Sequence, residues 1–134
     1  ALNVLRQERG WEVGGVMHYF QGDWSVAEEC MEMGFLISFG KPVLRYPYLK
    51  EIARKLPVES IVLETDSYPQ PFKKVRSNWT EPKDIILIAQ ELASIKGLTL
   101  DEFTEATSNN LLNLFRRLGA TGKARAIIGS EKHP

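Results

Sequence analysis

Ile-Val-Leu-Glu-Thr-Asp-Ser, residues 61–67, is a short apolar run followed by two acids. Residues 15–20, Gly-Val-Met-His-Tyr-Phe, show a comparable pattern, because a short apolar stretch leads to a histidine. Each stretch predicts a β-strand whose carboxyl end carries a side chain able to bind a metal ion. In α/β proteins, ligands and catalytic groups collect at the carboxyl ends of the strands. The two stretches therefore predict an α/β fold and the place of its chemistry.

Expected strands and helices alternate along the chain. The expected strands are residues 13–20, 35–39 and 61–65, and the expected helices lie at the N-terminus and at residues 24–33, 48–56, 81–96 and 99–118. Each connection between strands is long enough for a helical crossover, which implies a parallel sheet covered by helices. We assign residues 1–118 to one domain. Residues 119–134, where Gly, Lys, Arg and Ser surround only two isoleucines, are expected to be a flexible tail.

Composition restricts the classes of protein that the chain can belong to. It has 134 residues and a formal net charge of zero, which fits one globular domain and argues against charge-driven binding to DNA or membranes. No apolar run is as long as a membrane span, and the first residues lack a signal-peptide pattern, so we expect a cytoplasmic protein without a membrane partner. The single cysteine, Cys30, is expected to be a small buried hydrophobic residue.

Side-chain alternation predicts which polar groups meet. Glu64 and Asp66 share one face of the third expected strand, and His18 shares a face of the first with Val16. If these faces belong to the same interior surface, a histidine and an aspartate meet at the strand ends. The alternative is a buried, hydrogen-bonded histidine and an aspartate that caps a helix. The spacing alone leaves both interpretations open.

Several motifs, in order along the chain, resemble the signatures of the TatD family. They are Gly-Val-Met-His-Tyr-Phe-Gln-Gly at residues 15–22, Phe-Leu-Ile-Ser-Phe-Gly at 35–40, Leu-Glu-Thr-Asp-Ser at 63–67, Asn78 with Glu81 and Pro82, and Thr107, Asn110, Leu114 and Phe115. The TatD family comprises metal-dependent deoxyribonucleases and related phosphoesterases built on a (β/α)8 TIM barrel. The resemblance implies that residues 1–118 are the C-terminal part of such a barrel, with its last three parallel strands and their helices.

The resemblance also implies roles for individual residues. His18 would be a metal ligand, and Asp66 would bind metal and act catalytically by helping to activate water. Glu64 faces the interior beside Asp66, and we expect it to support the ligands, with direct ligation as the alternative. Because a guanidinium group has a planar fork of donors that suits phosphate, we expect Arg76, in the long loop after the third strand, to contact a substrate phosphate, with plain solvation as the alternative. The cofactor would be divalent metal ions, either Mg²⁺, Zn²⁺ or Mn²⁺.

The remaining ligands of the TatD family do not occur in this sequence. They are a His-x-His pair, a glutamate and a further histidine on other strands, and this chain contains no His-x-His. A catalytic ion usually has three protein ligands, so we expect the chain alone to bind metal weakly and to be inactive. An open three-stranded sheet also has unpaired edges. We therefore expect the inward-facing side chains to be exposed, namely Val16, Phe20, Leu36 and Val62. The chain would then pair with a missing N-terminal half of the barrel, form a small three-layer sheet closed by its own helices, or self-associate.

The prediction from the sequence is a TatD-type metal-dependent hydrolase in which water attacks a DNA phosphodiester at a divalent-metal site. Two alternatives stay open. One is a noncatalytic truncated fragment or interaction module. The other is an amide or ester hydrolase of the wider amidohydrolase-like group, which an assay of DNA against small esters would distinguish.

Overall fold

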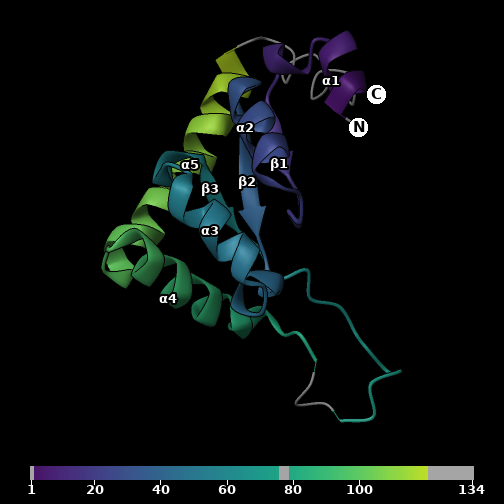
Figure 1. The fold of residues 1–134 in the computed structure, drawn as a ribbon, viewed down its shortest axis with the longest axis vertical. Helices are drawn as coiled ribbons and strands as arrows, with labels where there is room; N and C mark the ends of the chain where they lie inside the picture. The colour runs from purple at the N-terminus through teal and green to yellow at the C-terminus, as the bar shows by residue number, and fades with distance from the viewer. Residues whose placement is uncertain (1, 76–78, 121–134) are drawn as a thin grey trace, which may run out of the picture.

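The centre of the molecule is a small parallel sheet. The computed structural model describes residues 2–75 and 79–120 (Figure 1). Three strands, β1 (Gly15–Met17), β2 (Phe35–Phe39) and β3 (Ile61–Leu63), lie in the order β1-β2-β3. Both strand pairs are parallel, which confirms the predicted α/β class. Because the strands run in the same direction, their carboxyl ends lie along one edge of the sheet.

Helices connect the strands and pack on the sheet. The segments before β2 are α1 (Leu2–Gln7), the 3-10 turn η1 (Gly10–Glu12) and α2 (Trp24–Glu32). Those between β2 and β3 are η2 (Lys41–Leu44), α3 (Pro47–Lys55) and η3 (Val58–Ser60). Those after β3 are η5 (Pro82–Asp84), α4 (Ile85–Lys96) and α5 (Leu100–Ala120). Figure 1 shows α2 and α3 beside the sheet, and the segment after β3 extending away from it. No helix in the described part of the chain combines the length and the apolar character needed to cross a membrane.

Polar residues define where two of these helices begin. The side chain of Asp23 accepts a hydrogen bond from the N–H of Val26 at 3.0 Å, which caps α2 as predicted. Before α5, the N–H of Thr99 donates to Glu102 Oε2 at 2.8 Å, and the N–H of Glu102 donates back to Thr99 Oγ1 at 3.2 Å. This is the predicted capping box. Helix α4 ends at Lys96, and the residue that follows it, Gly97, has a left-handed φ of 67°, the conformation that commonly terminates a helix.

The core lies between the sheet and its helices. Side chains from β2 and β3 pack against apolar side chains of all the longer helices; the largest fully buried ones include Ile37, Phe39, Leu49, Ile61, Leu92 and Phe103. Cys30 is also fully buried, as predicted, and burial raises the pKa of its thiol. The core therefore resembles that of an ordinary α/β domain even though the sheet is open.

The structure corrects some of the expected details. β1 is shorter than residues 13–20, because Tyr19 has a left-handed φ of 50° and ends the regular alternation. The expected exposure of Phe20 and Val62 was wrong, since they are only 5% and 6% exposed. Phe20 packs edge-on against Phe39, with ring centroids 6.3 Å apart.

Two predicted helix ends also change. Thr80 does not cap a helix, because Glu81 and Asp84 form a capping box around η5 before α4 begins. Helix α5 continues through residue 118 to Ala120, so the first two residues of the predicted tail are helical. Residues 121–134 lie outside the described residues.

Candidate metal centre

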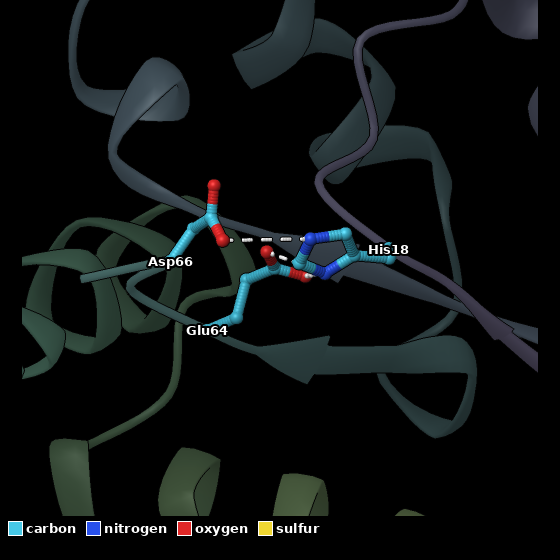
Figure 2. A group of neighbouring side chains, drawn as sticks. All are labelled: His18, Glu64 and Asp66. Carbon is cyan, nitrogen blue, oxygen red and sulfur yellow. Dashed lines mark hydrogen bonds and ion pairs between the residues drawn. The ribbon is translucent and has the colours of Figure 1, made fainter. Parts of the chain in front are cut away.

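Three metal-capable side chains meet at the carboxyl edge of the sheet. His18 directly follows β1, Glu64 directly follows β3, and Asp66 lies two residues further on. Each offers a ligand atom, and these atoms lie within 4.8 Å of one another. Figure 2 shows the carboxylates of Glu64 and Asp66 both facing the imidazole ring of His18. The parallel sheet therefore brings together residues that are 46 positions apart in the sequence.

Glu64 organises this cluster. Its side chain is only 14% exposed, against 67% for His18 and 48% for Asp66. Glu64 Oε2 accepts the N–H of Tyr19 at 2.8 Å and lies 3.0 Å from Nδ1 of His18. On the other side of the ring, Nε2 of His18 lies 3.6 Å from Oδ1 of Asp66. The contacts of Glu64 therefore fix both the histidine ring and the backbone that follows it.

The backbone beside the cluster is unusual at two residues. Tyr19 and Asp66 both have a left-handed φ of 50°. For residues with a Cβ atom this conformation costs about 1–2 kcal/mol, although aspartate adopts it more readily than tyrosine. At Tyr19 the backbone N–H in this turn points to Glu64. Strained residues of this kind concentrate at functional sites, which agrees with a functional role for this edge.

Tyr19 also lies in the electrostatic field of the cluster. Burial, and then the negative charges of Asp66 and Glu64, raise the pKa of its hydroxyl group. The ring packs against Gly40, at the end of β2, where an added Cβ atom would come within 3.0 Å of it. Gly40 therefore provides the room for a tyrosine beside the cluster.

The donor set fits a divalent cation. One imidazole and two carboxylates are common ligands of Zn²⁺ and Mn²⁺, and carboxylates also suit Mg²⁺. Oε1 of Glu64 is buried, and among the described residues no donor forms a hydrogen bond with it, although Nδ1 of His18 is 2.9 Å away. A cation would satisfy such an oxygen. The alternative of a buried histidine is wrong, because the His18 side chain is 67% exposed.

The other predicted site residue cannot be placed. Arg76 belongs to residues 76–78, which lie outside the described residues. Sequence reasoning also missed the hydrogen bond from Tyr19 to Glu64. That bond depends on the left-handed turn at Tyr19, a conformation for which tyrosine gives no local signal.

Fold and cluster together define an α/β protein with a candidate metal centre at the carboxyl edge of a partial barrel. The chain belongs to the TatD family, since the family described as TatD related DNase matches residues 1–116.

Curated relatives agree with this membership. An uncharacterized metal-dependent hydrolase of Bacillus subtilis, YabD, is 36% identical over 122 residues, which cover 86% of this chain and 46% of that protein. A putative deoxyribonuclease of Xenopus laevis, tatdn3-B, is 38% identical over 118 residues, covering 87% of this chain and 44% of that protein. The human deoxyribonuclease TATDN3 is 35% identical over 118 residues, covering 87% of this chain and 41% of that protein. The chain thus spans less than half the length of these relatives.

Solved structures give the same fold. The TatD homologue YJJV of Escherichia coli superimposes with a TM-score of 0.72 at 25% identity, over 84% of this chain and 44% of that one. A TatD family hydrolase of Entamoeba histolytica superimposes with a TM-score of 0.69 at 25% identity, over 84% of this chain and 46% of that one. With three parallel strands in an open sheet, the predicted partial TIM barrel is confirmed.

Proposed function

We propose that this chain supplies part of the active site of a TatD-type hydrolase that cleaves a DNA phosphodiester by water attack at a divalent-metal site. The observation that carries the proposal is the convergence of His18, Glu64 and Asp66 from two strand ends. Relatives named metal-dependent hydrolase or deoxyribonuclease support the choice of reaction and substrate.

In this proposal each residue of the cluster has a distinct role. His18 and Asp66 would hold the ion, with direct ligation by the unsatisfied Oε1 of Glu64 as the alternative to a supporting role. Glu64 supports them, because its contact with Nδ1 of His18 directs Nε2 of the ring toward Asp66. Asp66 is half exposed, so water and substrate can reach its carboxylate, which accepts the proton of the attacking water. The bound ion would lower the pKa of that water and offset the charge of the phosphate.

The same proposal includes a partner that completes the barrel. Beside β3, at the edge of the sheet, lies an apolar groove of about 310 Å³ whose lining includes Val62, Ile85, Ile86, Leu100 and Leu111. Within the described residues, β3 pairs only with β2, and an apolar groove beside such an edge strand is a surface on which further strands and helices would pack. The chain on its own is therefore expected to self-associate, and a monomeric sedimentation profile with one cooperative unfolding transition would contradict this.

The roles are tested in an intact barrel that contains this segment. His18→Ala and Asp66→Asn should each lower the rate of hydrolysis of a labelled oligodeoxynucleotide by about 100-fold or more, because ligands and their supports control metal-dependent activity. Asp101→Asn, at an exposed acid in the first turn of α5, is the matched control and should leave the rate unchanged. Retained activity in both site variants would refute the roles. Activity on p-nitrophenyl acetate with none on DNA would refute the substrate class.

A further inference from the structure

A polar pocket shares Tyr19 with the surroundings of the metal centre. It has a volume of about 250 Å³, and its lining includes Tyr19, Gln21, Lys41, Arg45, Tyr46 and Lys73. We call it the basic pocket. Tyr19 connects it to the cluster, because its backbone N–H binds Glu64 while its side chain lines the pocket. A ligand bound in the basic pocket would therefore contact Tyr19, the residue that directly follows His18.

The charges in the basic pocket favour an anion. Among the residues that the structure describes, the lining includes three cationic residues and no acid. Lys41 is held in place from behind by Asp84, whose Oδ2 lies 3.0 Å from the ammonium group. Arg45 is exposed and has no ion-pair partner in residues 2–75 and 79–120. A guanidinium group presents a planar fork of donors that matches two phosphate oxygens, so Arg45 is the strongest candidate for a phosphate contact.

Aromatic rings lie beside these cations. Tyr46 and Tyr48 are 41% and 46% exposed, and their ring centroids are 6.1 Å apart. The hydroxyl group of Tyr48 donates to the backbone carbonyl of Gln21 at 3.2 Å, which ties this pair to the segment after β1. Exposed tyrosine rings next to a basic groove are the combination on which nucleobases stack while the backbone phosphates are neutralised.

We propose that the basic pocket binds one nucleotide of a nucleic-acid strand, with its phosphate at Arg45 and Lys41 and its base on the ring of Tyr46. This inference rests on the proposed function, because the strand that occupies the pocket continues to the phosphodiester at His18 and Asp66. It gives the hydrolase a subsite for the nucleotide that neighbours the scissile bond.

The phosphate contact is tested by binding rather than by hydrolysis. A fluorescently labelled oligothymidylate is titrated with the chain in EDTA, so that no metal-dependent cleavage can occur. Arg45→Gln should weaken binding by about 3- to 20-fold and reduce the slope of log K against log salt by about 0.7. Arg54→Gln removes the same charge from the last turn of α3, outside the pocket lining, and should change binding less than about twofold.

The base contact is tested with a conservative pair of variants. Tyr46→Phe keeps the aromatic ring and should bind oligothymidylate as the original chain does, whereas Tyr46→Leu should bind about tenfold more weakly. An abasic oligomer of the same length should bind Tyr46→Leu and Tyr46→Phe equally, because it has no base to stack.

Three results would overturn the subsite. They are no binding by the original chain, equal effects of Arg45→Gln and Arg54→Gln, or equal binding of oligothymidylate by the two Tyr46 variants. Binding by the chain could depend on Arg45 and Tyr46 while the intact barrel fails to cleave DNA. That pair of results would support the subsite and refute only the proposed hydrolysis. The two proposals can therefore fail separately.

Discussion

Asn110 joins α5 to the strand that carries the metal-capable acids. Its side chain is 8% exposed, and Nδ2 donates to the carbonyl of Val58 at 2.7 Å and to that of Ile61 at 2.8 Å. The Val58 carbonyl also accepts the N–H of Ile61, so it keeps one partner when the asparagine is removed. Losing one of two bonds at Val58 costs about 0.5–1.5 kcal/mol, and losing the buried bond at Ile61 about 1–3 kcal/mol. Asn110→Ala should therefore reduce the free energy of unfolding by about 2–4 kcal/mol.

Asn113→Ala is the matched control for this prediction. Asn113 lies on the same helix but is exposed, and its side-chain oxygen accepts a hydrogen bond from Nη1 of Arg116 at 3.4 Å. Both changes raise helix propensity equally, so the difference between them isolates the buried hydrogen bonds. Urea unfolding followed by far-UV circular dichroism should show a midpoint lower by about 1–2 M for Asn110→Ala alone. Unfolding free energies within about 0.5 kcal/mol of each other would refute the reasoning.

Three further predictions concern stability and access. A hydrogen bond from the N–H of Glu81, and then the contact with the Lys41 ammonium group, lower the pKa of Asp84 in the folded chain. The charged carboxylate therefore stabilises the fold at any pH above the pKa that Asp84 has in the unfolded chain. This stabilisation is lost as the pH falls through the lower pKa of the folded chain. Asp84→Asn should therefore reduce the loss of stability on acidification, measured by urea unfolding from about pH 5 to pH 2, and an unchanged pH dependence would contradict this. Gly34→Ala should lower the unfolding free energy by about 1–2 kcal/mol in thermal melts, because Gly34 has φ 73°, and a stability equal to that of the original chain would be inconsistent with that conformation. Cys30 should react with a thiol reagent much more slowly in the native chain than in urea, since burial excludes the reagent and raises the thiol pKa; equal rates would show that the core opens.

Local patterns were sufficient to predict most of the fold. The strand at Phe35–Phe39 was predicted with the correct ends, because a short, mostly apolar run bounded by a glycine on each side is typical of a β-strand. The meeting of His18 and Asp66 was one of two interpretations that the strand spacing left open, and the structure brings them together because parallel strands place their carboxyl ends along one edge. These features depend on periodicity and topology, which a sequence displays directly.

Other features depend on conformations that no local pattern shows. The left-handed turn at Tyr19 shortens the first strand, gives Glu64 its backbone hydrogen bond and precedes the buried Phe20. The basic pocket combines residues from the end of β1, from η2 and from the segment after β3, so no single stretch of sequence displays it. No sequence pattern therefore indicates that Lys41 and Arg45 share a site.

Divalent-metal binding tests the central claim most directly. Mn²⁺ is titrated into the chain by calorimetry, with His18→Ala and Asp66→Asn as site variants and Asp101→Asn as the matched control. We predict weak binding that is weakened further, by about tenfold or more, in either site variant and is unchanged in Asp101→Asn. Mn²⁺ binding that is equally strong in all four proteins would contradict a metal centre at His18, Glu64 and Asp66.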